Sequence, residues 1–126
     1  DFGTHTVFNA ISTNGEFLGG SIAPGITMSA ESLFINSSQL GKVELIPPNS
    51  VIAKSTSTNI QSGLIYGYVA LVEGMVKKMK DELGPNTSVI GTGGLIQLIS
   101  NLTTVFDNLN LDITLIGLKY IYEMNK

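Results

Sequence analysis

The sequence of 126 residues has no cysteine, no arginine and a single histidine, His5. Without cysteine the chain cannot form a disulfide framework or a thiolate metal site, and one histidine excludes a multi-histidine metal site. The absence of arginine removes the bidentate phosphate clamp that this residue would provide. Because the seven lysines form no basic patch and the net charge is -3, we expect no nucleic-acid partner.

Charged residues are also scarce, at 13% of the chain, whereas about a quarter is usual in a soluble domain. Hydrophobic residues reach 43%, so the chain can build the core of one domain. A surface with so few charges suggests that another part of the protein or a partner subunit covers some of it. Neither a signal peptide nor an apolar run long enough to cross a bilayer is seen, so we expect no membrane contact and a cytoplasmic protein.

The first stretch, Asp1-Phe2-Gly3-Thr4, places an acid, a glycine and a hydroxyl directly before an apolar strand. A glycine lets the backbone approach a ligand closely, and the amides of such a turn can form an anion-binding concavity. Asp1 supplies an oxygen ligand that suits a cation. The alternative is an ordinary polar turn before a hairpin. Since a strand usually precedes such a site and no initiating methionine is present, we interpret the chain as a fragment whose upstream strand pairs with residues 4–12.

Residues 4–12 and 17–23 have the composition of two strands of a hairpin. Asn14-Gly15 between them favours a type I′ turn. The pair Gly19-Gly20 weakens the return strand and suggests close approach of a ligand or of backbone.

A helix is predicted at residues 26–40, where Met28, Leu33 and Leu40 can share an apolar stripe. A small edge strand is predicted at residues 43–46, because Pro47-Pro48 would end it.

A long helix at residues 60–83 is the clearest element, since its apolar residues recur at steps of three and four. Thr58 or Asn59 is predicted to cap its start, and Gly84-Pro85 to end it. Three interior glycines cost helix stability and therefore suggest close packing, either against a second subunit or internally against the sheet. They are Gly63, Gly67 and Gly74.

The remaining residues predict a strand, a glycine-rich turn at Gly91–Gly94, and further short elements. A strand followed by glycines and a helix N-terminus is a geometry that suits phosphate. The expected elements are a buried strand at 87–90, a helix at 95–100, a strand at 104–106 and a helix at 111–125. For the last helix, Asp112 or Thr114 is the expected cap, with Ile113, Leu118, Ile121 and Tyr122 on or near one face. The fold class is therefore mixed α/β.

Several segments in order resemble the C-terminal half of a type III pantothenate kinase, a family that includes the Bvg accessory factor. Gly19–Gly25 (Gly-Gly-Ser-Ile-Ala-Pro-Gly) and the Ser62-Gly63 pair after Thr56 carry the resemblance most specifically. Asp1–Thr4 and Thr92–Gly94 are similar to its phosphate and adenosine motifs, and Leu115 with Gly117-Leu118 to its closing segment. The resemblance implies a lobe of the ribonuclease H-like fold (actin and hexokinase superfamily) over residues 1–126 of a two-lobed kinase, with the N-terminal lobe absent from this chain.

The resemblance also implies roles for single residues. Asp1 would bind a monovalent cation, potassium or ammonium, and Thr4, Gly93 and Gly94 would contact ATP. Substrate contacts to pantothenate fall on Thr56 and on the Gly19-Gly20 pair. Magnesium is implied as a second cofactor, and a homodimer through helix 60–83 as the assembly.

No catalytic residue is expected within the chain, because the family's general-base aspartate belongs to a Gly-x-Asp-Arg motif upstream of Asp1. The implied activity is ATP-dependent phosphorylation of pantothenate to 4'-phosphopantothenate, the first step of coenzyme A synthesis, with the fragment alone inactive. Two alternatives are a non-catalytic regulatory relative of the Bvg accessory factor type and a dimerisation module with a vestigial nucleotide cleft. The position of His5 on a strand favours a packing role over a phosphate contact.

Overall fold

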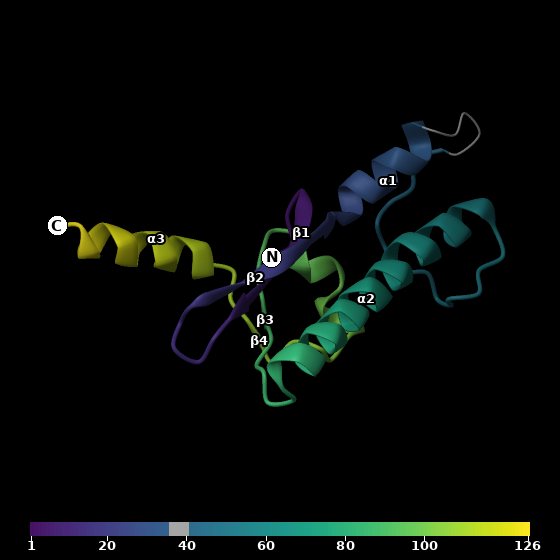
Figure 1. The fold of residues 1–126 in the computed structure, drawn as a ribbon. Helices are drawn as coiled ribbons and strands as arrows, with labels where there is room; N and C mark the ends of the chain where they lie inside the picture. The colour runs from purple at the N-terminus through teal and green to yellow at the C-terminus, as the bar shows by residue number, and fades with distance from the viewer. Residues whose placement is uncertain (36–40) are drawn as a thin grey trace.

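The computed structural model describes residues 1–35 and 41–126, and it confirms a mixed α/β domain (Figure 1). One long helix, α2, runs beside two small sheets, and the shorter helices α1 and α3 lie on opposite sides of the view in Figure 1. In order, the elements are β1 (His5–Ile11), β2 (Phe17–Pro24), α1 (Ile26–Ile35), α2 (Thr56–Leu83), β3 (Ile90–Gly91), the 3₁₀ turns η1 (Ile96–Leu98) and η2 (Ser100–Leu102), β4 (Asn108–Leu109) and α3 (Ile113–Met124).

The predicted hairpin is confirmed as the antiparallel pair β1–β2, but its turn is not type I′. That type needs a positive φ at both central residues, and of Asn14 and Gly15 only Gly15 has one, at 81°. The Gly15 amide donates to the Ser12 carbonyl, and the Ser12 hydroxyl accepts from the Asn14 and Glu16 amides. The serine side chain therefore stabilises a wider loop than the Asn-Gly pair alone predicts.

The described part of helix α1 ends at Ile35, and the predicted extension to Leu40 lies outside the described residues. The stripe through Met28 and Leu33 is wrong, because both side chains are exposed and the helix buries Ile26 and Ala30 instead. The core side of α1 is thus set by small and β-branched residues near the sheet.

The long helix α2 is confirmed and begins earlier than predicted, at Thr56. Its cap is Ser55 rather than Thr58 or Asn59: the Ser55 hydroxyl accepts from the Thr58 amide, and the Thr58 hydroxyl accepts from the Ser55 amide. This reciprocal capping box satisfies two donors at the helix start.

The edge strand predicted at residues 43–46 does not form. The carbonyls of this loop bond to side chains of α2 instead of to a neighbouring strand. Gln61 donates to the Glu44 carbonyl (3.0 Å), Tyr66 to that of Pro48 (2.6 Å) and Ser62 to that of Val51 (2.5 Å).

Three predicted elements after α2 are also wrong. The strand at 87–90 is displaced to Ile90–Gly91, where it pairs in parallel with Asn108–Leu109. The helix predicted at 95–100 is two 3₁₀ turns, so Ile96 and Ile99, three residues apart, share one face and are both fully buried. Phe106 packs against the core rather than continuing a strand.

The core lies between α2 and the segment around Phe2. The Phe2 ring makes edge contacts with Tyr68 of α2 (centroids 6.1 Å apart) and with Phe106 (5.7 Å). The other core members, all nearly inaccessible, are Ile26, Ile65, Val69, Val72, Val76, Ile96 and Ile99. Phe2, the second residue of the sequence, is therefore a central part of the hydrophobic core.

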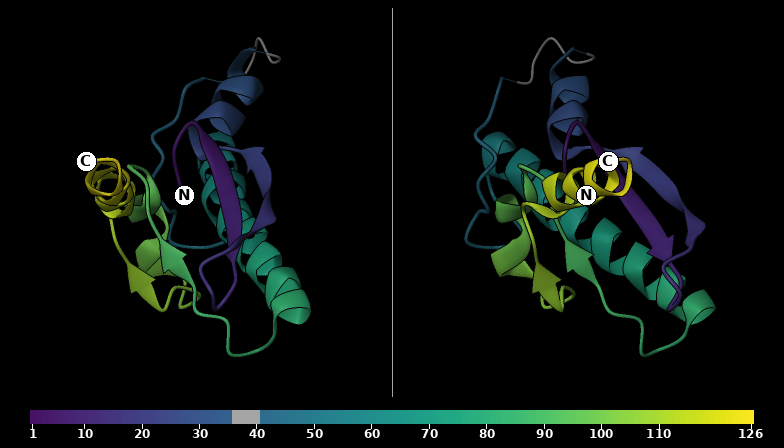
Figure 2. Two further views of the ribbon diagram at one scale, coloured as in Figure 1. Left: turned by 60° about the vertical axis from the view of Figure 1, so that its left-hand side comes forward. Right: turned by 90° about the vertical axis from the view of Figure 1, so that its left-hand side faces the viewer.

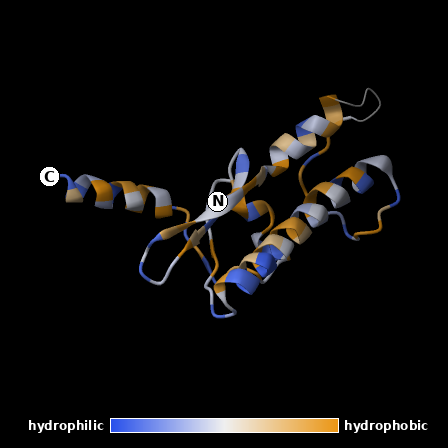
Figure 3. Cartoon of the chain, in the orientation of Figure 1, coloured by the Kyte–Doolittle hydropathy of each residue, from blue (hydrophilic) through white to orange (hydrophobic). Residues whose placement is uncertain are grey.

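Helix α3 extends away from this core (Figures 1 and 2) and buries none of its residues. Its predicted extent is nearly confirmed. Asp112 is the N-cap residue, but its side chain makes no capping bond. Apolar residues recur along its length (Figure 3), and the four predicted to share a face are all solvent-exposed in this chain.

Candidate functional site

The two glycine turns singled out in the sequence are hydrogen-bonded to each other. The Phe2 amide donates to the Thr92 carbonyl (2.9 Å), and the Leu95 amide donates to the Phe2 carbonyl (3.0 Å). The two turns are therefore in direct contact.

Gly93 makes this contact possible. Its φ is +99°, and a Cβ on it would collide with the Phe2 backbone and lie 2.6 Å from Asp1 Oδ1. The Asp1 carboxylate thus lies directly beside the glycine turn. An L-residue at position 93 would be strained and would also push the two turns apart.

Three residues of the two hydrogen-bonded turns are open to a ligand. The Asp1 side chain is exposed, and its carboxylate has no hydrogen bond or ion pair within the described residues. Thr4 is exposed, while its carbonyl accepts from the Gly25 amide (3.1 Å) and so holds the turn in place. Gly94 has nothing within 4 Å of a Cβ position.

His5 is exposed at the start of β1, so the packing role predicted for it is wrong. Its carbonyl accepts from the Gly3 amide (3.1 Å), which closes the turn before the strand.

Asp1 and Thr92 line one hollow of about 330 Å³. It lies between β1 and β3, with the first turn of α3 at its rim. Its other lining residues are Asn9, Ile11, Ser88, Ile90, Ile113 and Thr114.

The Gly19-Gly20 pair lies elsewhere, in a hollow of about 310 Å³ between β2 and the last turns of α2. The Gly19-Gly20 pair was predicted to allow close approach either of a ligand or of backbone. Gly20 fits the second, because a Cβ there would collide with the Phe8 carbonyl of the neighbouring strand. The contact between the two strands of the hairpin is therefore enough to explain why position 20 is glycine.

Thr56 lines a third hollow, of about 600 Å³, between α1 and the start of α2. Its neighbours there include Ser29, Ser32 and Asn59. The residues assigned to nucleotide and to pantothenate thus do not share a single hollow of this chain.

Comparison with known proteins identifies the family. A family model described as type III pantothenate kinase matches residues 1–78, which is more than half of the chain. The chain belongs to the type III pantothenate kinase family. The matched residues include Asp1, Thr4, the Gly19-Gly20 pair and Thr56.

Individual members of the type III pantothenate kinase family match the rest of the chain as well. A relative from Roseiflexus sp. (strain RS-1) is 49% identical over 99% of this chain, and one from Syntrophus aciditrophicus (strain SB) is 46% identical over 99%. In both, the match covers 49% of the relative, so the chain spans about half the length of the curated relatives it matches.

A solved structure shares the fold. It is a conserved Baf family protein from Campylobacter jejuni and aligns with a TM-score of 0.72 over 99% of this chain and 56% of its own. At 22% identity this likeness concerns the fold alone.

The residues described by the structure contain no group of three or more His, Asp or Glu side chains that could hold a metal ion, and no helix long and apolar enough to span a membrane.

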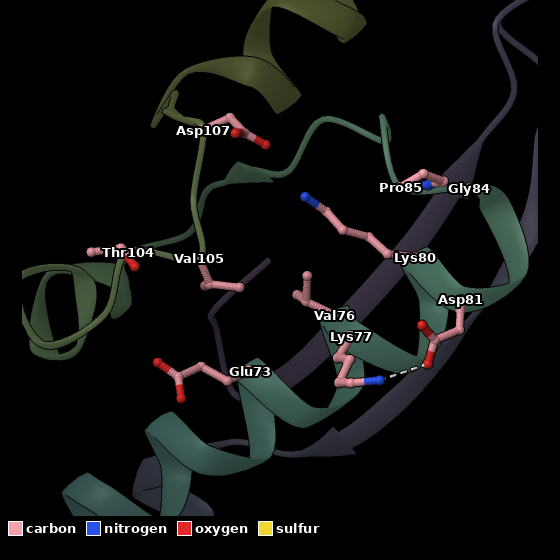
Figure 4. A pocket seen from close by; sticks show the side chains of 10 residues that line it. All are labelled: Glu73, Val76, Lys77, Lys80, Asp81, Gly84, Pro85, Thr104, Val105 and Asp107. Carbon is pink, nitrogen blue, oxygen red and sulfur yellow. Dashed lines mark hydrogen bonds and ion pairs between the residues drawn. The ribbon is translucent and has the colours of Figure 1, made fainter.

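Sequence reasoning missed one polar hollow, between α2 and residues 104–107 (Figure 4). It has a volume of about 560 Å³. Lys77 pairs with Asp81 (3.0 Å), Glu73 accepts from Thr103 (2.6 Å) and Asp107 accepts from the Val89 amide (2.7 Å), while Lys80 points into the space. The lysines were visible in the sequence, but Thr104, Val105 and Asp107, which line the hollow with them, come from a segment farther along the chain.

A buried hydroxyl pair fastens β1 to α2. The Thr6 and Tyr68 hydroxyls are hydrogen-bonded to each other, and Thr6 is fully buried. Burial raises the pKa of the Tyr68 phenol above its ordinary value, and the hydrogen bonds to Thr6 and to the Ile26 backbone oppose that shift in part. Tyr68 is therefore neutral at physiological pH and holds the Asp1–Thr4 turn against the long helix.

Proposed function

We propose that the complete protein phosphorylates pantothenate with ATP and that this chain supplies its C-terminal half, a lobe of the ribonuclease H-like fold. The observation that carries the proposal is the family membership: relatives 46–49% identical over essentially the whole chain are named type III pantothenate kinase. The general base would then lie in the other half, as the resemblance to the family implies. A cytoplasmic location follows from the same proposal.

The ATP phosphates would lie against the joined turns. Phosphoryl transfer depends mainly on positioning and on stabilising charge, which amides and hydroxyls can provide. The exposed Thr4 hydroxyl and the open space over Gly94 support this placement. Gly93 would act by keeping Asp1 and the Thr92–Gly94 turn in contact.

The monovalent cation would be held by Asp1. Its carboxylate is exposed, unpaired within residues 1–35 and 41–126, and beside the proposed phosphate site, so the residue fits a cation that shares ligands with the nucleotide. Such a cation, when bound, would offset phosphate charge in a region without arginine. Magnesium would be held chiefly by the phosphates themselves.

Pantothenate would contact Thr56 in the hollow between α1 and α2, which Ser29, Ser32 and Asn59 also line. Since this hollow is separate from the Asp1–Gly93 region, the other lobe or a second copy must complete the path between them. A role for Gly19 and Gly20 in substrate binding would be indirect, through the shape of the hairpin.

A homodimer through α2 is part of the proposal. Gly63, Gly67 and Gly74 all have open space where a side chain would lie, so the alternative of internal packing against the sheet does not account for them. A second helix could approach closely there. Gly67→Leu should shift the complete protein toward monomer in sedimentation experiments, whereas Gly41→Leu, at an open glycine outside α2, should not.

The test is a coupled assay for ADP with the complete protein, pantothenate, ATP, magnesium and potassium. We expect turnover that depends on potassium, and a weaker dependence in Asp1→Asn. A folded complete protein without turnover would refute the kinase and favour the non-catalytic alternative. A flat potassium response in both proteins would remove only the role of Asp1.

A further inference from the structure

The two binding regions proposed for this chain lie in different hollows, so the structure between them must fix their relative position. The nucleotide region is the pair of hydrogen-bonded turns around Asp1 and Gly93, and the pantothenate region is the hollow at Thr56. In enzymes, a misplacement of about 1 Å between reacting groups can cost a rate factor of about a hundred. A group that holds both regions in place therefore has a direct influence on phosphoryl transfer.

One buried cluster contacts the elements that carry both regions. The Tyr68 hydroxyl of α2 is hydrogen-bonded to the Thr6 hydroxyl of β1, and the Thr6 hydroxyl donates to the Pro24 carbonyl at the end of β2 (3.5 Å). The Ile26 backbone, at the start of α1, makes a further hydrogen bond to the Tyr68 phenol. Four elements, β1, β2, α1 and α2, therefore meet at a single phenol.

The two hydroxyls depend on each other because both are shielded from water. Thr6 is fully buried and Tyr68 is 7% exposed. The Thr6 hydroxyl has one proton, which it donates to Pro24, so the Tyr68 hydroxyl is the donor to Thr6. Burial raises the pKa of the Tyr68 phenol, so this proton is retained. Removing the phenol hydroxyl would leave the buried Thr6 oxygen without its donor, which costs more than an exposed hydrogen bond does.

On the nucleotide side, the cluster acts through Phe2 and Gly25. The Phe2 ring packs edge-on against the Tyr68 ring, with centroids 6.1 Å apart. The Gly25 amide, at the junction of β2 and α1, donates to the Thr4 carbonyl (3.1 Å), and a Cβ on Gly25 would lie 2.1 Å from that oxygen. The Asp1–Thr4 turn therefore cannot shift without disturbing the junction that Tyr68 holds.

On the pantothenate side, the cluster acts through the two helices that form the walls of the hollow. Ser29 and Ser32 of α1 line one wall, and Thr56 of α2 lines the other. The Ser29 amide donates to the Gly25 carbonyl (2.9 Å), which ties the first turn of α1 to the same junction. Because Tyr68 joins that junction to α2, a change there would alter how the two walls lie relative to each other.

We propose that Tyr68 is a positioning residue for phosphoryl transfer, which fixes the Asp1–Thr4 turn relative to the hollow at Thr56 through its hydrogen bond to Thr6. Neither Tyr68 nor Thr6 belongs to the residues that line the two hollows, so the phenol acts through the elements that it joins and does not touch substrate. This inference rests on the proposed kinase function.

The first test is steady-state kinetics of the complete protein carrying Tyr68→Phe, which removes the hydroxyl and keeps the ring against Phe2. We expect kcat to fall by about tenfold and the KM values for ATP and pantothenate to stay within about twofold, because each hollow keeps its own lining. Tyr66→Phe is the matched control, since on the same helix it removes a phenol that donates to the Pro48 carbonyl (2.6 Å), and it should leave kcat unchanged. An unchanged kcat in Tyr68→Phe, or an equal loss in Tyr66→Phe, would overturn the proposal.

Substitutions at Thr6 separate positioning from a loss of stability. Thr6→Ser removes a buried methyl group but keeps the hydroxyl, so kcat should be retained, whereas Thr6→Val should lower kcat as much as Tyr68→Phe does. Since the two hydroxyls act as one unit, the double variant with Val at position 6 and Phe at position 68 should be no slower than either single variant. Losses that multiply in the double variant, or an equal loss in Thr6→Ser, would count against the proposal.

Hydrogen exchange requires no catalysis, so it distinguishes failure of this inference from failure of the kinase. The Gly25 amide should exchange about tenfold faster in Tyr68→Phe than in the unsubstituted complete protein, and at an unchanged rate in Tyr66→Phe. Equal exchange in all three proteins would reject the positioning role even in an active kinase. Faster exchange only in Tyr68→Phe, in a protein without turnover, would refute the kinase and retain the link between Tyr68 and the Asp1–Thr4 turn.

Discussion

The two ends of this chain differ sharply in how completely their side chains are packed. Phe2 is 3% exposed and contacts aromatic rings from two other segments, whereas α3 has no buried residue although it is rich in Leu, Ile and Tyr. The comparison teaches that the N-terminal turn is packed by other segments of this chain, whereas the apolar residues of α3 are not.

The largest effect is expected from substituting Gly93, which allows the Asp1–Thr4 turn to contact the Thr92–Gly94 turn. Gly93→Ala should strain the backbone and separate Asp1 from the glycine turn, with turnover in the complete protein falling by about a hundredfold or more. Gly94→Ala is the matched control for stability, because a Cβ there meets no atom. Thermal unfolding should show a lower melting temperature for the first variant and little change for the second; equal melting temperatures would contradict the close contact.

Paired substitutions measure the contrast between core and α3 directly. Ile65→Ala, at a fully buried position of α2, should lower the free energy of unfolding by about 2–5 kcal/mol. Ile121→Ala, on the exposed face of α3, should change it by less than about 0.5 kcal/mol if α3 stays in water. Denaturant unfolding of the complete protein decides the matter: a cost above 1 kcal/mol at Ile121 would show that another part of the protein covers α3.

A smaller effect is expected at the start of α2. Thr56→Ala should raise the pantothenate concentration needed for half-maximal turnover by about tenfold, the loss of one hydrogen bond in a polar site. Thr58→Ala removes the capping partner of Ser55 without changing Thr56, so it should lower stability and leave the pantothenate requirement unchanged. An unaltered requirement in Thr56→Ala would remove this residue from the substrate site.

The smallest effect concerns pH. Because burial raises the pKa of Tyr68 when the protein is folded, the neutral phenol contributes stability that is present below the ordinary pKa near 10 and is lost as pH rises through the folded value. The free energy of unfolding should therefore fall less steeply above pH 10 in Tyr68→Phe than in the unsubstituted protein. Identical slopes in the two proteins would contradict the burial of this phenol.

The elements that sequence reasoning predicted correctly are those with local causes. The three- and four-residue spacing from Ile65 to Val76 determines α2, and the alternating hairpin composition determines β1 and β2. The cap of α2 was missed because Ser55 to Asn59 offers several equivalent polar side chains, and only the local geometry selects Ser55.

Elements that depend on distant partners could not be predicted in this way. The two-residue strands β3 and β4 exist because they pair with each other, and Val105 and Phe106 pack on the core instead of forming the strand that their composition favoured. For the candidate site, the sequence singled out both glycine turns. It did not indicate that Phe2 joins them through its own backbone, because that contact spans most of the chain.

Because the Phe2 ring packs between Tyr68 and Phe106, its NMR signal can report ligand binding at the neighbouring turns. A ligand that pulls on the Asp1 or Gly3 backbone would tilt a ring held at near-right angles to two others, and ring currents change steeply with such tilts. A fluorine-labelled phenylalanine at this position would then sense nucleotide and cation occupancy by NMR, through an interior side chain that touches neither.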